Sequence, residues 1–240
     1  MNRPNSTAPV VSDAALSNAL AEYQTYVGPT TEFEPTLLRV STRQSGQPRR
    51  ANVRTLGQAT FVSGQANPGK VSDVNAAGLR HRIGELEKTI KPHIARIAGS
   101  YRKFIHDAFP ILDDPIVARL QTGNMVGCDP LVAAAMTLVT MPWYSKQPDN
   151  PVISDMEHRK VEGLTFALFQ QSLYLPTLNT VQAGLLLMQC PQVDTKALNT
   201  QLAEITFELG LHLDCGEWGL DETIQGLRRR LAWGVFVQDK

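Results

Sequence analysis

The sequence predicts an all-α protein, a multi-helix bundle of antiparallel helix hairpins with an irregular, loop-rich N-terminal segment. From residue 79 onward, apolar residues recur every three or four positions, the spacing of one face of an α-helix. Short loops containing Pro or Gly separate these segments, which favours antiparallel neighbours. Apolar residues make up 42% of the 240 residues, enough to bury a core.

Two regions are expected: a flexible arm and irregular segment over 1–78, and a helical domain over 79–240. Within the first, a short helix is predicted over 16–23, ended by Gly28 and Pro29. The apolar runs 33–40 and 53–62 are candidate strands.

Five arginines in this segment have no acidic residue between them: Arg39, Arg43, Arg49, Arg50 and Arg54. They are interpreted as a solvated loop rather than a phosphate-contacting or localisation patch. The reason is that five charges spread along the chain are sparse for phosphate contact.

The first long helical pattern is interrupted by Pro92, which lacks the N–H that a helix interior needs. The pattern predicts one helix over 79–90, a break, and a second helix over 92–107 closed by Pro110. Its apolar face consists of Leu86, Ile90, Ile94, Ile97, Tyr101 and Phe104.

Two Asp-Pro pairs predict the next helix starts, with Asp114 and Asp129 as capping residues before a proline. Gly123 is the expected stop of the first helix. The second is apolar nearly all round, which predicts burial on every side. A loop is expected over 142–151.

Four further helices follow from capping signals at Ser154, Thr177, Asp194 and Asp221. Gly210 is expected to adopt a left-handed conformation after the third, with Leu211 folding back on its last turn. The apolar faces comprise Val161, Leu164, Leu168 and Phe169; Leu178, Val181, Leu185 and Met188; Leu198, Leu202, Ile205 and Leu209; Ile224, Leu227, Leu231 and Val235.

Composition argues against several functional classes. Lys plus Arg and Asp plus Glu both number 23, so the chain lacks the basic excess of a self-sufficient nucleic-acid binder. Its apolar stretches are too short to span a membrane, and no secretory signal is visible at the N-terminus. Three scattered cysteines, Cys128, Cys190 and Cys215, are typical of reduced, mostly buried thiols.

No catalytic or metal motif is found, so no catalytic or metal-binding residue is predicted. A metal cluster of His106 with Asp107, Asp113 and Asp114 is the alternative considered, but helix capping by Asp114 is the simpler interpretation. The acidic residues Asp155, Glu157 and Glu162 are assigned to the negative first turn of a helix.

Three consecutive arginines, Arg228 to Arg230, are the most unusual local feature. Successive helical residues turn by about 100°, so these side chains fan over roughly 200° and cannot share one phosphate surface. Structural ion pairing is therefore favoured over nucleic-acid contact or a protein interface. The candidate partners are Glu204, Glu208 and Asp214.

Several segments, taken in order, are similar to the middle homology region of fungal Zn(II)2Cys6 transcription factors, also called the fungal-specific or xylanolytic-activator regulatory domain. They are Thr180-Val181-Gln182, then Gly210-Leu211-His212-Leu213-Asp214, then Arg228-Arg229-Arg230-Leu231-Ala232-Trp233 with Asp239 beyond. Tyr26-Val27-Gly28 and the segment Tyr101 to Leu112 also resemble this family. Ala232 departs from it, since an aromatic residue is usual there.

The resemblance implies a nuclear regulatory domain in RNA polymerase II transcription, without an enzyme activity and incomplete at its C-terminus. It implies that zinc and DNA bind only an upstream cluster absent from these residues. Homodimerisation, co-regulators or a small-molecule effector are the partners expected. A small-molecule-sensing helical module, with an apolar cavity beside the buried helix 130–141, is the alternative function. The signature residues, with structural roles, are Gln182, Gly210, Leu211, His212, Asp214, Arg228, Arg229, Arg230, Leu231, Trp233 and Asp239.

Overall fold

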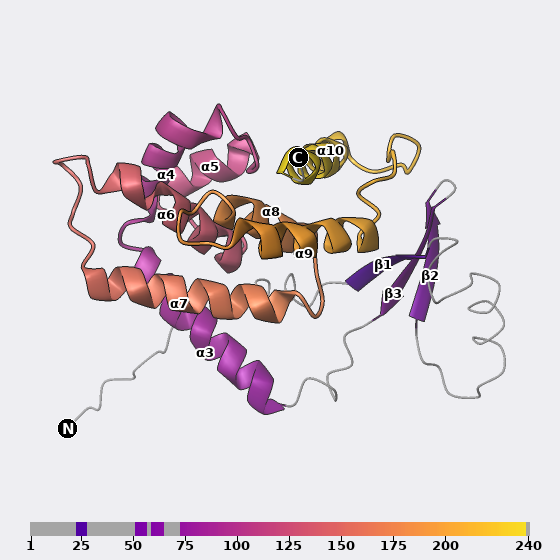
Figure 1. Cartoon of the computed structure of the whole chain (residues 1–240), viewed down its shortest axis with the longest axis horizontal. Helices are drawn as coiled ribbons and strands as arrows, with labels where there is room; N and C mark the ends of the chain where they lie inside the picture. The colour runs from indigo at the N-terminus through magenta and orange to yellow at the C-terminus, as the bar shows by residue number, and fades with distance from the viewer. Residues whose placement is uncertain (1–22, 28–50, 57–58, 65–72, 239–240) are drawn as a thin grey trace, which may run out of the picture.

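The computed structural model describes residues 23–27, 51–56, 59–64 and 73–238. This part is mostly helical, which confirms the predicted fold class, and eight α-helices pack against one another (Figure 1). Their bounds are α3 Asp73–Ile90, α4 Ile94–Tyr101, α5 Asp114–Gln121, α6 Pro130–Tyr144, α7 Asp155–Ser172, α8 Leu178–Leu187, α9 Thr195–Glu208 and α10 Glu222–Gln238. A π-helical turn, η1 Arg102–His106, extends α4.

The chain breaks between α3 and α4 around Pro92, as predicted. The six apolar positions predicted to share one face are buried, with the exception of Phe104, which is 39% exposed in η1. The π-helical turn explains this exception, because its wider winding changes the direction of the side chains that follow Tyr101.

Helix α5 starts one residue earlier than expected, which corrects the role predicted for Asp114. Asp113 occupies the N-cap position without a capping hydrogen bond, and Asp114 is the first helical residue. Pro115 therefore lies at the second helical position. Gly123 ends the helix with a positive φ of 81°, as predicted.

Helix α6 is buried on all sides, from Pro130 to Met141 and again at Tyr144. The Asp129 carboxylate accepts a hydrogen bond from the backbone N–H of Leu131 at 2.8 Å, which confirms the predicted cap. The helix runs through Pro142, so the loop expected over 142–151 begins three residues late. Burial of Tyr144 explains this, because it stabilises a further helical turn.

Ser154, Asp194 and Asp221 accept hydrogen bonds from backbone N–H groups as predicted, whereas Thr177 takes the N-cap position of α8 without such a bond. Ser154 and Glu157 form a reciprocal capping box at α7, and Asp194 accepts from the backbone N–H groups of Lys196 and Ala197 at α9. Gly210 has a φ of 63°, and the N–H of Leu211 donates to the carbonyl of Thr206 at 2.9 Å. These are the features of a Schellman motif.

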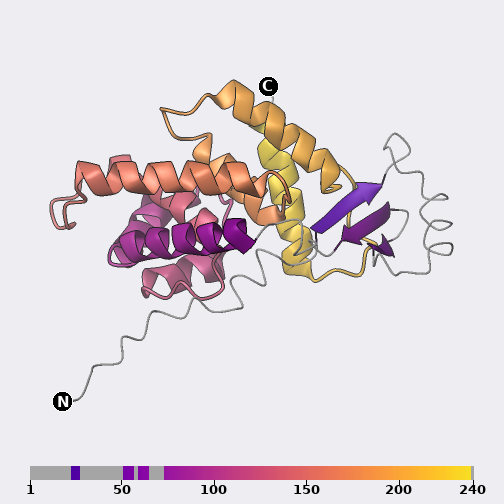
Figure 2. The ribbon, with the colours of Figure 1, turned by 90° about the horizontal axis from the view of Figure 1, so that it is seen from below.

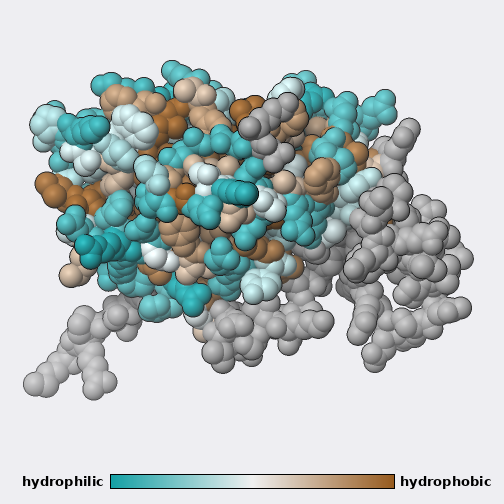
Figure 3. All heavy atoms as spheres, in the orientation of Figure 1, coloured by the Kyte–Doolittle hydropathy of each residue, from teal (hydrophilic) through white to brown (hydrophobic). Residues whose placement is uncertain are grey.

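The helices form layers around α6, which packs against α4, α7 and α8. Helices α3 and α7 lie side by side, and α10 crosses next to α8 and α9 (Figure 2). The predicted face of α10 is buried at Leu227, Leu231 and Val235, whereas Ile224, in the first turn of the helix, is 39% exposed. Figure 3 shows hydrophobic residues on one face as separate patches between hydrophilic ones.

A three-stranded antiparallel sheet was not predicted. Its strands are β1 Tyr23–Val27, β2 Ala51–Leu56 and β3 Ala59–Gly64, in the order β1-β3-β2. The apolar run 53–62 is thus a hairpin rather than one strand. Tyr23, expected to end a helix, begins β1; the rest of that helix and the run 33–40 lie outside the described residues.

The sheet packs on the segment between α9 and α10. Ala59 and Phe61 form a small core with Cys215 and Trp218, separate from the main helical core. A Cβ on Gly210 would lie 3.1 Å from the Phe61 ring, so this glycine also permits the close approach of the sheet.

The contact between α8 and α9 gives a test of the packing. A Cβ on Gly184 would lie 2.5 Å from a Cδ of Leu202, a fully buried side chain, whereas a Cβ on exposed Gly163 in α7 meets nothing within 4 Å. Both Gly→Ala changes gain similar helix propensity, so their difference isolates the clash. We expect Gly184→Ala to be less stable than Gly163→Ala by about 1–3 kcal/mol in urea unfolding. Equal stabilities would contradict this packing.

Candidate functional site

The three consecutive arginines of α10 diverge to three different partners. Arg228 donates from Nη2 to the backbone carbonyls of Leu209 at 2.8 Å and Gly210 at 3.1 Å. Its guanidinium carbon also stands 4.7 Å from the centroid of the Trp218 ring. Arg228 therefore fixes the end of α9, where carbonyl groups lack helical partners.

The other two arginines form ion pairs. Arg229 pairs with Asp214 at 3.1 Å, and this hydrogen bond holds the pKa of the Asp214 carboxyl below its usual value. Arg230 pairs with Asp113 at the start of α5. Asp214 is one of the predicted partners, whereas Asp113, 117 positions from Arg230, is not.

Helices α8 and α10 both contact the segment 106–114, which joins η1 to α5. The buried Gln182 of α8 donates to the carbonyl of Ile111 at 3.0 Å. Arg230 of α10 reaches Asp113 in the same segment. Gly234 of α10 faces Ile111 as well, since a Cβ there would lie 3.4 Å from its Cδ1. This segment thus connects signature residues that are distant in sequence.

Asp114 closes the same segment onto η1. Its carboxylate pairs with Arg102 and lies 3.0 Å from Nε2 of the buried His106. The hydrogen bond from Arg102, followed by that from His106, holds the Asp114 pKa below its usual value. The stability that this carboxylate contributes is therefore present above its usual pKa and is lost as the pH falls through the lowered value.

Aromatic side chains connect the sheet to the signature loop after α9. The ring of His212 lies 4.9 Å from that of Phe207 and 5.3 Å from that of Tyr26. Phe61 of β3 contacts Trp218 edge-on at 5.2 Å. Partial burial lowers the pKa of His212, which favours the neutral ring in this cluster.

Most of the signature residues thus lie in or contact one of two places: the segment 106–114 or the loop after α9. Leu211 and Leu231 are buried in the main core, and Gln182 is buried beside Ile111. Trp233 differs, because 65% of its surface is exposed and its ring contacts that of Phe236 on the same helix edge-on at 5.5 Å. Asp239 lies outside the described residues.

The groups considered for chemistry are separated. Among the described residues, no three His, Cys, Asp or Glu side chains come together as metal ligands. Glu157 is engaged in the Ser154 capping box, which lowers its pKa. Burial raises the pKa of the Cys128 thiol to about 12 and that of Cys190 to about 11, so both remain thiols near neutral pH.

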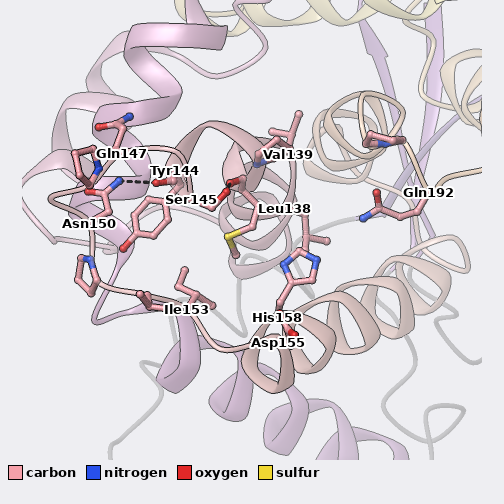
Figure 4. Close-up of a pocket in the computed structure, with 16 residues that line it drawn as sticks. Leu138, Val139, Tyr144, Ser145, Gln147, Asn150, Ile153, Asp155, His158 and Gln192 are labelled. Atoms are coloured by element: carbon pink, nitrogen blue, oxygen red, sulfur yellow. Dashed lines mark hydrogen bonds between the residues drawn. The ribbon is translucent and has the colours of Figure 1, made fainter.

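A pocket with a volume of about 550 Å³ opens at the C-terminal end of α6 (Figure 4). Leu138, Val139 and Met141 of α6 form its apolar floor. The loop after α6, the first turn of α7 and the segment after α8 form its walls. Sequence reasoning placed a cavity beside helix 130–141, but not these walls, because they come from three separate segments.

Polar side chains around the pocket fall into two sets. The first set supports the loop: Asn150 donates to the carbonyl of Tyr144 at 3.0 Å, and Gln147 donates to Ser100 at 3.1 Å. The second set is Asp155, His158 and Gln192, whose side chains make no hydrogen bond within the described part of the chain. His158 and Gln192 point toward the same space in Figure 4.

The two ion pairs of α10 differ in burial, which predicts different strengths. The side chains of Arg230 and Asp113 are 35% and 15% exposed, whereas those of Arg229 and Asp214 are 56% and 79% exposed. We expect a coupling of about 1–2 kcal/mol for Arg230–Asp113 and less than about 1 kcal/mol for Arg229–Asp214. Two double-mutant cycles to Ala, read by denaturant unfolding, measure both. A surface pair as strong as the inner pair would refute this ranking.

The chain is similar in sequence to two fungal transcriptional regulators. The chain is 26% identical over 167 residues to the transcriptional activator protein DAL81 of Saccharomyces cerevisiae, covering 67% of this chain and 17% of that protein. It is 27% identical over 153 residues to an uncharacterized transcriptional regulatory protein of Schizosaccharomyces pombe, covering 60% of this chain and 23% of that protein. The chain thus spans under a quarter of each relative. No solved structure matches.

No helix in the described ranges has the length and hydropathy needed to cross a membrane. The sequence profile of the fungal specific transcription factor domain matches residues 98–240, more than half of the chain. This match includes α5 to α10, the three arginines and the segment 106–114 that they contact. The family is one of transcription factor domains rather than enzymes. The chain belongs to the fungal-specific transcription factor domain family.

Proposed function

We propose that this domain regulates RNA polymerase II transcription in the nucleus through contacts with other proteins, and that it does not itself read DNA sequence. The observation that carries this proposal is that all three arginines of the run bind partners within the chain. Arg228, Arg229 and Arg230 each bind a partner within the chain, so their charges are committed to the fold. The zero net charge is in accord with this.

DNA and zinc binding are assigned, in this proposal, to a cysteine-rich cluster elsewhere in the protein. The 240 residues contain three cysteines and no Cys-x-x-Cys pair, so they do not supply the six thiolates of such a cluster. The expected protein partners are a second copy or transcriptional co-regulators. Exposed Trp233, Phe236 and Val237 on α10 support a protein contact, because large apolar side chains lie together there.

Tethering tests this function. Residues 1–240 fused to an unrelated DNA-binding domain should change transcription of a nuclear reporter relative to that DNA-binding domain alone. A Gly184→Leu fusion, which overfills the α8–α9 contact, should lose the effect, and Gly163→Ala should keep it. The unfused chain should give no sequence-specific gel shift at nanomolar concentration. A specific shift, or a fusion without effect, would refute the proposal.

A second candidate function is the sensing of a small-molecule effector. The pocket at the end of α6 supports it, since about 550 Å³ is within the usual size of ligand sites and apolar floor residues are combined with a few polar groups. A ligand that binds the folded state raises the midpoint of thermal unfolding. A broad metabolite panel should therefore include compounds that raise Tm, and a panel without any would count against this function.

A further inference from the structure

The charge of the pocket limits what it can bind. None of its 16 lining residues is Lys or Arg, and its one carboxylate is Asp155. The arginine that binds the loop, Arg96, directs its guanidinium to the backbone carbonyl of Asp149 and not into the pocket. An anionic ligand would meet a carboxylate without a lining cation, which is unfavourable. A cationic or neutral ligand is favoured.

The polar side chains of the pocket that make no hydrogen bond within the described residues narrow the class of ligand further. Asp155 and His158 are three residues apart on the first turn of α7, so they share one face of that helix. Gln192, in the segment after α8, faces His158 across the pocket (Figure 4). The Asp155 carboxylate accepts hydrogen bonds only, which suits an ammonium group, while His158 and Gln192 can each accept a further hydrogen bond from an ammonium N–H.

The floor sets the rest of the ligand. Leu138, Val139 and Met141 offer an apolar surface. Pro142 of α6 and the wall residues Pro148, Pro151 and Pro191 add methylene groups without N–H donors. The thioether of Met141 can also make favourable contacts with an aromatic ring. The floor therefore suits a hydrocarbon or aromatic body rather than a sugar or phosphate.

We propose that the pocket binds a small primary amine with an apolar, ring-sized body, its ammonium group at Asp155 and its body on the α6 floor. This inference rests on the second proposed function, the sensing of a small-molecule effector. The ammonium group lies at the rim, where Asp155 is exposed, and the body lies deeper. Asp155 thus favours a positively charged group, and the α6 floor favours an apolar, ring-sized body.

Three compounds of nearly equal shape test the charge preference: 2-phenylethylamine, 2-phenylethanol and phenylacetate. Ligand-observed NMR titration of the full chain gives the affinity of each. The amine should bind about fivefold more tightly than the alcohol, which is the upper end for one exposed ion pair, and phenylacetate should bind most weakly.

Two variants separate the site from general charge effects. Asp155→Asn should lower the affinity for the amine to that for the alcohol. The affinity for the alcohol should not change, which would show that the pocket of this variant is intact. Asp149→Asn, which removes a carboxylate of the neighbouring loop that does not line the pocket, should retain the preference. An amine preference that survives Asp155→Asn, or tighter binding of phenylacetate, overturns the proposed class.

The metabolite panel distinguishes failure of the proposed ligand class from failure of the effector function itself. If panel compounds raise Tm but the amine binds no better than the alcohol, the ligand class is wrong and the effector function stands. If neither the panel nor the amine series binds, the effector function fails together with the ligand class.

Discussion

Burial of α6 is the constraint on which the rest of the fold depends. This helix has no polar face, so neighbours must cover it on all sides, and α4, α7 and α8 do so. Its two interior hydroxyls need no outside partner, since Thr137 and Thr140 donate to the carbonyls of Ala133 and Met136 at 2.8 and 2.7 Å. The helix can therefore be surrounded by apolar side chains without leaving a polar group unpaired.

The elements of the helical part could be predicted because their signals are local. Asp129, Ser154 and Asp194 start helices through hydrogen bonds to N–H groups two or three residues on, and such spacing is visible in the sequence. The sheet could not be predicted in the same way. β1 pairs with β3 across more than thirty residues, and its Tyr23 fits either a helix or a strand by local pattern alone. The start of α5 was predicted one residue too late, at Asp114, because Asp113 offers the same capping chemistry one residue earlier.

For the candidate site, the sequence predicted that the three arginines diverge, but it anticipated only one of their three partners. The 100° turn between successive residues predicts that three arginines diverge, and Asp214, fifteen positions before Arg229, is close enough to anticipate as a partner. Asp113 is not, since only the packing of α10 beside the segment 106–114 brings it to Arg230. The pocket has the same origin: Asp155 and His158 are polar residues of an ordinary first turn until α6 is placed opposite them.

The pocket follows from the same constraint that builds the bundle. α6 continues through Pro142 to the buried Tyr144, and at this end the α7 helix begins and α8 has already ended. Cover for the last turns must then come from loops, whose pocket-lining residues include Pro148, Pro151 and Pro191. The apolar floor formed by α6 therefore stays open beside the polar side chains of Asp155, His158 and Gln192. Near the other end, the carboxylate of Asp129 binds Asn179 of α8 at 3.2 Å, so α6 and α8 start together and the opening lies where both stop. A ligand there would extend the cover of α6, which is why its binding should stabilise the whole bundle rather than the loop alone.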